Sequence, residues 1–287
     1  MIVHKLGAKG YLNWIPDKWF IQIVYRCDSG EKLNLNNPTK FSEKIQWTKL
    51  YDRKPQYKTY VDKFAARDMI REKIGEKYLI PLYNVYDSTD AIEWSKLPKD
   101  FVMKCSHDSG SSIICNDKSK LNIEDTIKKL KFHLKRDWFW FAREWAYKGI
   151  KPRIIVEKNI SEGKNTPDDY KILCFNGKAS EIEVHKDRYQ KIKLQTYDVH
   201  WNHLRVKFEG YGEFEEKLEK PACLDEMISL SEILAEDTII ARIDWYISSG
   251  KLYFGEITLY ESAGFFGTDD MDWNIRVGKL IDIHKTK

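Results

Sequence analysis

Two carboxylates near the C-terminus are spaced in a way that suits phosphate chemistry. They belong to two apolar segments, residues 239–247 and 252–259, which are separated by the polar run 248–251. This pattern predicts a β-hairpin with one carboxylate on each strand, Asp244 on the first and Glu256 on the second. Across a short hairpin, two such side chains can lie close together on one face.

Two further residues of the predicted hairpin extend this cluster. Thr258 follows Glu256 on the same face of the second strand, and Arg242 precedes Asp244 on the first. Oxygen ligands of this kind suit Mg²⁺ that bridges nucleotide phosphates, because Mg²⁺ is usually held by one or two carboxylates together with phosphate oxygens and water. The alternative is a plain hairpin whose acidic residues face water.

A polar loop farther upstream is a second candidate for phosphate binding. Residues 101–105 and 113–115 have the character of strands, and the Ser- and Gly-rich residues 106–112 between them can offer backbone N–H groups to an anion. Lys104 on the first of these strands can add a positive charge. The loop is not a Walker A motif, because it lacks the G-K-[ST] signature and a following helix.

The composition is that of a folded protein with an ordinary core. Of the 287 residues, 42% are hydrophobic and 32% are charged, and the net charge is +4. This small charge makes no case for a nucleic-acid partner, although it permits local patches that bind anions. The five cysteines form no C-x-x-C pair, which indicates free thiols rather than disulfides or a zinc site.

The N-terminus lacks the long apolar run of a signal peptide or a transmembrane helix. We therefore expect a cytoplasmic protein without a membrane span. The short apolar segment 19–25 leaves peripheral contact with the inner face of the membrane open, although a buried helix is the more frequent use of such a segment.

The remaining segments include helices and strands, and the helix-then-strand passage over residues 60–86 is typical of an α/β subdomain. The residue pattern predicts strands at 78–86 and 152–160, and a hairpin over 169–185 that turns at Asn176-Gly177. Residues 190–221 show little periodicity and are expected to be mostly loop and short strand. Helices are predicted at 15–25, from 39 or 42 to 50, and at 60–74, 121–147, 223–235 and 273–283.

The order of these signals resembles the ATP-grasp superfamily. More narrowly, the chain looks like the TupA-like ATP-grasp family, which is associated with bacterial surface-polysaccharide gene clusters. The resemblance is carried by NPTKF at 37–41, EKIQW at 43–47, KLYDR at 49–53, DYK at 169–171, CFNGK at 174–178 and YFGEIT at 253–258, with shorter matches at 62–63, 97–98, 101–102 and 152–154.

The resemblance implies two α+β subdomains whose antiparallel sheets clasp ATP. It divides the chain into an N-terminal helical segment at 1–60, an N-subdomain at 61–150 and a C-subdomain at 151–287. It also implies a role for each residue that matches the family pattern. Lys63 and Lys104 would meet the α- and β-phosphates, and the loop of Ser109, Gly110 and Ser111 would close over the γ-phosphate.

Other implied roles concern the base, the ribose and the metal. Glu157 and the backbone of Lys158 and Ile160 would bind adenine, Asp169 would hold the ribose hydroxyls, and Lys171 belongs to the ATP-binding set. Asp244, Glu256 and Thr258 would surround Mg²⁺. Arg242 would neutralise the transferring phosphoryl group and, with Lys104, would be catalytic.

The activity implied is an ATP- and Mg²⁺-dependent ligation of a carboxylate to an amine through an acylphosphate. The acceptor would be a saccharide or uronate of a surface polysaccharide, and the nucleophile an amine or amino acid. His185, Lys186 and Arg188 are candidates for holding the acceptor. Alternatives are a sugar or polysaccharide kinase, a glycosyltransferase that uses a nucleotide-sugar, and a non-catalytic nucleotide-binding protein.

The chain departs from the family pattern at three places. Thr258 stands where the superfamily usually has Asn, and a hydroxyl is a reasonable substitute as an oxygen ligand. Asp108 lies in the loop expected to receive phosphate, which it would repel unless its side chain points away. Tyr260-Glu261 replaces a common proline, which bears on the choice of acceptor.

Overall fold

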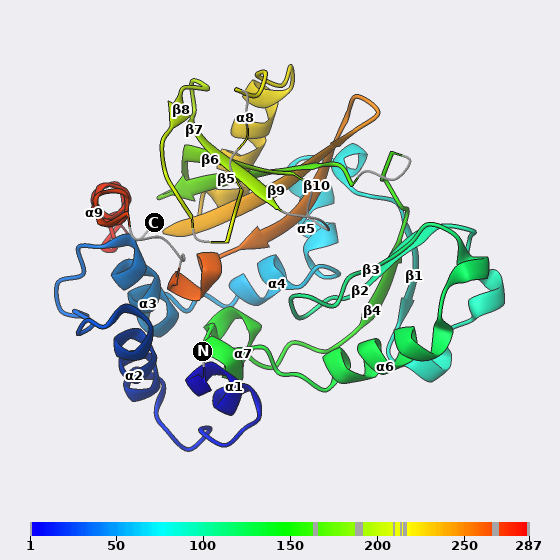
Figure 1. Cartoon of the computed structure of the whole chain (residues 1–287), viewed down its shortest axis with the longest axis horizontal. Coiled ribbons are helices and arrows are strands. Elements are labelled where there is room, and N and C mark those ends of the chain that lie inside the picture. Colours follow the sequence, from blue (N-terminus) through cyan, green and yellow to red (C-terminus); the bar gives the residue numbers. More distant parts are fainter. Residues whose placement is uncertain are drawn as a thin grey trace.

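Two antiparallel sheets organise the part of the chain that the computed structural model describes, residues 2–162, 166–186, 192–208, 210–212, 214, 217–265 and 270–285. The smaller sheet has the strand order β1-β4-β2-β3, and the larger has the order β10-β9-β5-β6-β7-β8 (Figure 1). The strands are β1 (Leu82–Tyr86), β2 (Phe101–Cys105), β3 (Ile113–Cys115), β4 (Ile154–Glu157), β5 (Asp168–Phe175), β6 (Lys178–Lys186), β7 (Lys193–Asp198), β8 (His203–Leu204), β9 (Ile240–Ser248) and β10 (Lys251–Thr258).

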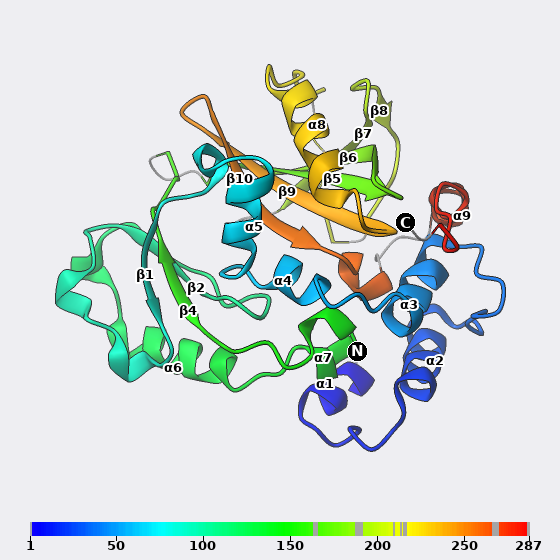
Figure 2. The ribbon, with the colours of Figure 1, turned by 180° about the vertical axis from the view of Figure 1, so that it is seen from behind.

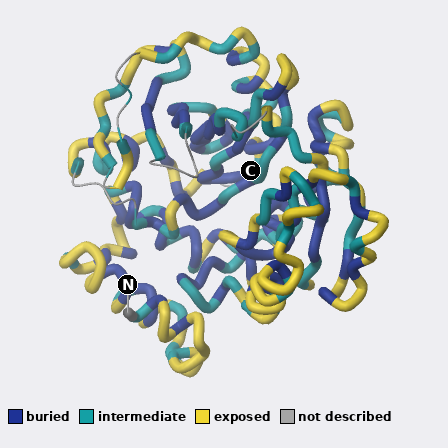
Figure 3. Tube along the Cα trace, turned by 45° about the vertical axis from the view of Figure 1, so that its right-hand side comes forward, coloured by how far each residue is buried: buried dark blue, intermediate teal, exposed yellow. Residues whose placement is uncertain are grey.

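Helices cover the outer faces of these sheets. Helix α6 packs on β2 of the smaller sheet, and α8 packs on β5 and β9 of the larger one (Figure 2). The strands are mostly buried, whereas the exposed positions gather on the outer helices and loops (Figure 3). The helices are α1 (Ile2–Ala8), α2 (Asp17–Ser29), α3 (Phe41–Tyr51), α4 (Tyr57–Val61), α5 (Ala66–Lys73), α6 (Ile123–Leu134), α7 (Phe139–Ala142), α8 (Leu224–Ala235) and α9 (Met271–Lys279).

Each sheet has its own apolar core, which accounts for the two-part architecture. Ile172 and Trp245 belong to the core of the larger sheet, and Phe101, Met103 and Val156 to that of the smaller one. All five side chains are buried, and burial of apolar area is the main force that holds each sheet to its helices. This arrangement is the α+β architecture expected from the sequence.

The predicted C-terminal hairpin is confirmed by β9 and β10. Asp244 pairs directly with Glu256, and Arg242 pairs with Thr258, so the four side chains belong to one face. A bulge at Gly255 interrupts the ladder between these residues and the turn. A Cβ at Gly255 would lie 2.9 Å from the ring of Tyr246 and 3.0 Å from the carbonyl oxygen of Asp244, so the bulge requires glycine.

The helix predicted over residues 60–74 is wrong at its start. The structure has α4, a break, and then α5. At the break the carboxylate of Asp62 accepts the backbone N–H of Phe64 at 2.9 Å, and the N–H of Lys63 donates to the carbonyl of Ser106 at 3.0 Å. These bonds replace helical ones, which is how aspartate competes with helix formation. They also turn Lys63 toward β10.

The single helix predicted over residues 121–147 is also wrong. Helix α6 ends at Leu134, α7 is a separate short helix, and a 3₁₀ turn follows at Trp145–Tyr147. Arg143 between them has φ 57° and is fully buried, with its guanidinium 4.3 Å from the ring centre of Trp140 and donating to the carbonyl of Leu12 at 2.9 Å. Tertiary contacts of Arg143 therefore override the helical periodicity of this segment.

Strand β4 bears on where the two subdomains meet. It follows the expected boundary at 150/151 but pairs with β1 and β2 of the smaller sheet. The chain therefore passes from the smaller to the larger sheet after Glu157. The predicted strands at 78–86 and 152–160 are present but shorter. The hairpin over 169–185 and the helices at 15–25 and 223–235 are confirmed, with shifts of a few residues at their ends.

Candidate functional site

A narrow pocket lies between the two sheets, and we call it the inter-sheet slot. Its volume is about 100 Å³, and both sheets contribute to its walls. Its lining combines apolar side chains with a few charged and polar ones, a pattern typical of small-molecule sites. It is lined by Ile80, Val102, Lys104, Ser112, Ile114, Glu157, Lys158, Asn159, Ile160, Ser161, Thr166, Pro167, Asp169, His185 and Tyr246.

Glu157 is held at one end of the slot by two cations. Lys104 Nζ lies 2.8 Å from Glu157 Oε2, and Arg67 Nη1 donates to Oε1 at 3.0 Å. Glu157 is only 5% exposed, so its charge needs this pairing. Arg67 also donates to the carbonyl of Ile80 at 2.8 Å, which fixes its guanidinium. Lys104 and Glu157 were predicted from the sequence, whereas Arg67 was not, because it lies on a helix face that looks solvated.

The backbone after β4 presents one acceptor and one donor at the slot. The N–H of Lys158 donates to the carbonyl of Pro81 at 2.9 Å, and the carbonyl of Ile160 accepts from Ser248 Oγ at 2.7 Å. Within the described residues, nothing donates to the carbonyl of Lys158 and nothing accepts from the N–H of Ile160. The spacing of this unpaired acceptor and donor suits the edge of a heterocyclic base.

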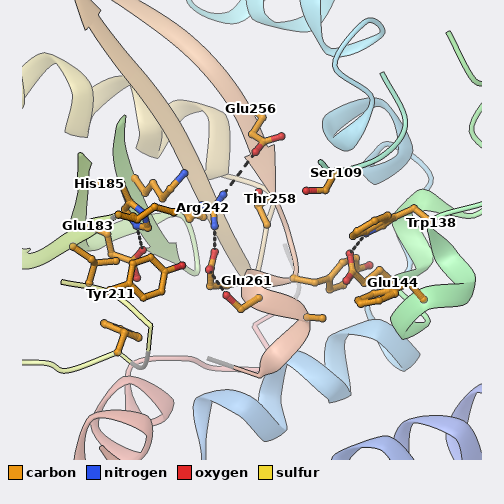
Figure 4. Close-up of a pocket in the computed structure, with 18 of the residues that line it drawn as sticks. Ser109, Trp138, Glu144, Glu183, His185, Tyr211, Arg242, Glu256, Thr258 and Glu261 are labelled. Carbon is orange, nitrogen blue, oxygen red and sulfur yellow. Dashed lines mark hydrogen bonds and ion pairs between the residues drawn. The ribbon is translucent and has the colours of Figure 1, made fainter. Parts of the chain in front are cut away.

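A cluster of opposite charges lies beside the slot on the larger sheet (Figure 4). Arg242 binds Asp244 through two hydrogen bonds of 2.6 and 2.7 Å, and its third nitrogen binds Glu261. Lys171 Nζ lies 2.5 Å from Asp244 Oδ2 and 2.9 Å from Asp169 Oδ2. Both carboxylate oxygens of Asp244 are therefore occupied, and β5 and β9 are tied together by charge.

Glu256 joins this cluster to the smaller sheet's side of the molecule. Its Oε2 lies 3.0 Å from Lys63 Nζ, and its Oε1 lies 3.8 Å from Arg242 Nη2. Burial acts to raise the pKa of Glu256, but Lys63, Arg242 and Lys171 outweigh it and hold the pKa far below its usual range. Burial likewise acts to lower the pKa of Lys63, yet Glu256 raises it. Both groups are thus charged at neutral pH.

The Ser/Gly loop between β2 and β3 faces the cluster with small residues only. Ser109 lines the cavity described below, Gly110 is exposed with φ 84°, and Ser111 is buried, where its hydroxyl accepts the N–H of Cys105 at 2.9 Å. Ser111 is one of the three residues expected to close over phosphate. Such a closure would either keep or break its hydrogen bond with Cys105. Lys63 Nζ donates to the carbonyl of Asp108 at 2.9 Å, which anchors the loop.

Asp108 points away from the site, which removes the objection that it would repel phosphate. Its carboxylate is fully buried and binds His133 Nδ1 of α6, and Arg136 Nη1 lies 3.8 Å away. The acidic residue in this loop is thus an anchor to α6.

A larger cavity opens on the other side of the charged cluster, and we call it the aromatic cavity. Its volume is about 380 Å³, and it borders the slot at His185 (Figure 4). Six aromatic side chains and four glutamates contribute to its lining, which makes it acidic as well as aromatic. The lining residues are Ser109, Trp138, Phe141, Glu144, Tyr147, Lys171, Glu183, His185, Ile192, Leu194, Phe208, Tyr211, Arg242, Glu256, Thr258, Tyr260, Glu261, Ser262 and Ala263.

Helix α3 supports one edge of the aromatic cavity through a strained turn. Ser262 and Ala263 have φ of 45° and 54°, which is unusual for residues other than glycine. The carbonyl of Ala263 accepts from Lys49 Nζ at 2.7 Å and from Gln46 Nε2 at 2.9 Å. These bonds hold the turn in the conformation that directs Glu261 to Arg242. In the sequence, Lys49 and Gln46 were noted only as parts of segments that resemble the family, and their contact with this turn was not predicted.

Of the residues expected to hold an acceptor, His185 and Lys186 do not line a common pocket. His185 lines both pockets and its Nε2 lies 3.0 Å from Glu183 Oε2. Lys186 lines neither pocket and pairs with Asp168 at 2.9 Å. Arg188 lies outside the described residues. Glu144, Glu183 and Glu261 were missed as candidates for this cavity, and only the unusual Glu261 gave a signal in the sequence.

The donor set for a divalent cation is only partly free in this structure. Glu256 has a quarter of its side chain accessible and Thr258 lines the same cavity, so both can present oxygen to a cation that also binds phosphate. Asp244 fits only if Arg242 and Lys171 release it. Among the described residues, no three His, Cys, Asp or Glu side chains form a ready-made metal site.

None of the helices in the described residues combines the length and apolar character of a membrane span.

Comparison with known proteins gives one match over most of the chain. Residues 43–281 match the model of the family described as TupA-like ATPgrasp. No curated protein is detectably similar to the chain.

Solved structures share only a remote likeness. D-alanine–D-alanine ligase from Bacillus anthracis, complexed with ATP, is 18% identical over 77% of this chain and 68% of that one, with a TM-score of 0.41. The corresponding ligase from Helicobacter pylori is 11% identical over 85% and 70%, with a TM-score of 0.42. D-cycloserine synthetase DcsG is 13% identical over 79% and 71%, with a TM-score of 0.41. Likenesses at this level do not identify a substrate.

Proposed function

Because the chain belongs to the TupA-like ATP-grasp family, we propose that it is an ATP- and Mg²⁺-dependent ligase that joins a carboxylate to an amine. The observation that carries this proposal is the position of the charged cluster. Lys171, Arg242 and Glu256 line the larger cavity, Lys63 pairs with Glu256, and Lys171 pairs with Asp169 of the narrow slot. A triphosphate bound there would have its base on one side and a second substrate on the other.

In this proposal the inter-sheet slot holds the nucleoside. Adenine lies between apolar walls, with the Lys158 carbonyl and the Ile160 N–H at its edge and Glu157 beside its amino group. Asp169 receives the ribose hydroxyls. The phosphates then reach cations that carboxylates already hold in place, namely Lys63, Lys104 and Lys171, with Ser109 and Gly110 in the loop above and Ser111 at its base.

Mg²⁺ is proposed at Glu256 and Thr258, with Asp244 joining when phosphate oxygens take over Arg242 and Lys171. Bound there, the ion would neutralise charge on the phosphates. Charge held in place in this way stabilises a transition state at little reorganisation cost. Arg242 and Lys104 are the proposed catalytic cations, because each can compensate for charge that develops as the phosphoryl group moves.

The proposed reaction has two steps. A carboxylate oxygen of the acceptor attacks the γ-phosphorus of ATP, which releases ADP and leaves an acylphosphate. The amine then attacks the acyl carbon, the C–O bond to phosphate breaks, and inorganic phosphate leaves with an amide as product. The acceptor carboxylate is proposed to belong to a uronate or other saccharide of a bacterial surface polysaccharide or its precursor, as the family resemblance implies.

A product assay with candidate acceptors tests this function. Incubation with ATP, Mg²⁺, D-glucuronate or D-galacturonate, and an amino acid should yield ADP, phosphate and an amide only when carboxylate and amine are both present. ADP with a phosphorylated sugar would instead identify a kinase. Release of UDP from a UDP-sugar, with ATP left intact, would identify a glycosyltransferase.

We propose a cytoplasmic location with peripheral contact at the inner face of the membrane. Exposed aromatic side chains near the N-terminus support the contact, since Tyr11, Trp14 and Trp19 are 66%, 80% and 63% exposed. Lys9 and Lys18 are exposed in the same segment, and basic residues with Trp and Tyr are typical of membrane-surface binding. Sedimentation with vesicles containing phosphatidylglycerol should fall when Trp14 and Trp19 are both changed to Ala. Equal sedimentation of that variant would contradict the contact.

A further inference from the structure

Glu144 is the one glutamate of the aromatic cavity that no described Lys, Arg or His side chain binds directly. Trp138 Nε1 donates to its Oε2 at 3.2 Å, and no described residue donates to its Oε1. The side chain is nonetheless buried, since the residue is 5% exposed. A buried carboxylate with a free oxygen facing a cavity lacks the partner that such a group normally has.

The other three glutamates of the cavity are already occupied. Glu183 accepts from His185, Glu256 pairs with Lys63, and Glu261 pairs with Arg242. An incoming cation would have to displace those partners. At Glu144 it would only fill a vacant position, so this carboxylate is the favourable place for a positively charged group.

Aromatic rings surround this position on the α7 side. Trp138 and Phe141 stack with their ring centres 5.1 Å apart, and the ring centre of Tyr147 lies 6.4 Å from that of Trp138. Aromatic walls exclude water and attract cations through their faces. In such surroundings, the attraction between a carboxylate and an ammonium is stronger than in bulk water.

We propose that this wall, made by Trp138, Phe141, Glu144 and Tyr147, binds the amine substrate as its ammonium ion and that Glu144 accepts a proton from it. The inference rests on the proposed ligase function and specifies which part of the cavity serves the nucleophile. The charged cluster at the opposite side then serves the phosphates and the acceptor carboxylate. Figure 4 shows the two walls facing each other across the cavity.

The proton balance of the second step gives Glu144 its role. An alkylammonium has no lone pair, so it must lose a proton before it can attack the acylphosphate. Glu144 takes that proton, the neutral amine forms the C–N bond, and the C–O bond to phosphate breaks. The second proton of the nitrogen leaves with the departing phosphate, which becomes hydrogenphosphate.

The electrostatic surroundings of Glu144 suit this task. Burial raises the pKa of Glu144, Lys49 of α3 and the hydrogen bond from Trp138 lower it, and Glu261 raises it, so that the pKa is about 7. Tyr147 and Tyr260 also face this carboxylate, and burial raises the pKa of each. A general base works best when its pKa is near the working pH.

Hydroxylamine tests whether the acylphosphate forms, independently of proton transfer to Glu144. It is largely uncharged at neutral pH, so it attacks without a base and yields a hydroxamate. With D-glucuronate or D-galacturonate, Glu144→Gln should keep hydroxamate formation and lose roughly 100-fold or more of amide formation with glycine, L-glutamate, L-lysine or ethanolamine. Glu144→Asp, which restores a carboxylate, should recover part of this loss. The matched control is Glu124→Gln, at an exposed position of α6.

Amine binding gives a readout that does not depend on turnover. Calorimetric titration with the same amines should detect binding to the wild type and at least tenfold weaker binding to Glu144→Gln. Equal binding by both proteins, or equal amide yields, would overturn the assignment. Hydroxamate without amide from any of these amines in the wild type would also overturn it. Amine binding without any hydroxamate would contradict the ligase function while leaving the ammonium site supported.

Discussion

The inter-sheet slot and the aromatic cavity adjoin each other, but their charged side chains are paired in different ways. In the slot, the carboxylate of Glu157 is bound by two cations, Lys104 and Arg67. In the cavity, glutamates outnumber cations, and no cation among the described residues binds Glu144. The carboxylate of Glu157 in the slot is thus already neutralised, whereas the cavity wall has a place for an ammonium ion, so the pairing of charges in each pocket indicates its ligand better than their number does.

The charged cluster, which lines the cavity and contacts Asp169 of the slot, explains how two pockets with different charge pairing can adjoin. Arg242 and Lys171 are held in place by Asp244, Asp169 and Glu261 before any phosphate arrives. Their positions therefore cost little to organise on binding, which is the advantage of a preorganised site. If the account is correct, substitutions on the two sides of this cluster should affect different substrates.

The largest effect is expected at Glu256, which lines the aromatic cavity and pairs with Lys63. Glu256→Gln keeps the shape but removes the charge proposed to bind Mg²⁺, so Mg²⁺-dependent ATP turnover should fall by roughly 100-fold or more. Circular dichroism should show an intact fold, and Glu124→Gln on the surface of α6 should turn over normally. Wild-type turnover by Glu256→Gln would place the metal elsewhere.

A smaller and more selective effect is expected in the slot. Lys104→Met removes a cation from Glu157 and from the proposed phosphate path, so the KM for ATP should rise by about 10- to 100-fold, the range of a lost charge-assisted bond. The KM values for carboxylate and amine should stay close to those of the wild type. Lys120→Met on the exposed surface is the control. Equal changes in the KM values of ATP, carboxylate and amine would contradict the assignment of separate pockets to these substrates.

The stability of the cluster should depend on pH in a defined direction. The pKa of Glu256 is lower in the folded protein than in the unfolded chain, because burial is outweighed by Lys63, Arg242 and Lys171. Its contribution is therefore present above its unfolded value of about 4.3 and is lost as the pH falls through the folded value. The difference in unfolding free energy between wild type and Glu256→Gln should shrink from pH 7 to pH 3. A constant difference in urea denaturation would contradict this charge pairing.

The smallest effect is expected at Thr258. Thr258→Val keeps the shape but removes the hydroxyl, and loss of one neutral oxygen ligand, worth about 1 kcal/mol, should raise the Mg²⁺ requirement about fivefold. Thr258→Asn, which supplies a carbonyl oxygen, should stay nearer to the wild type. If both variants match the wild type across a Mg²⁺ titration, Thr258 is not a ligand.

The sequence predicted the parts of the site that lie on regular strands. The alternation of β9 and β10 was enough to place Asp244 and Glu256 on one face, and the structure confirms their register. The turn at Asn176-Gly177 could also be predicted from the sequence, because the residues of a short turn determine the hairpin. In these segments the local preferences and the tertiary fold agree.

The parts that escaped prediction depend on contacts between distant segments. Lys63 leaves its helix because its backbone bonds to Ser106, and Glu144 reaches the cavity because Arg143 breaks the helix against Leu12. Neither partner is visible in the local pattern. Glu144 also sits within an aromatic run that reads as a core helix, so its role emerges only once the wall around it is assembled.

A crystal structure with Mg²⁺ and a non-hydrolysable ATP analogue tests the central claim most directly. The account predicts adenine in the inter-sheet slot, phosphates bound by Lys63, Lys104 and Arg242, and Mg²⁺ bound by Glu256. The analogue bound elsewhere, or bound while Glu256 and Asp244 keep all of their present ion pairs and no metal, would contradict it.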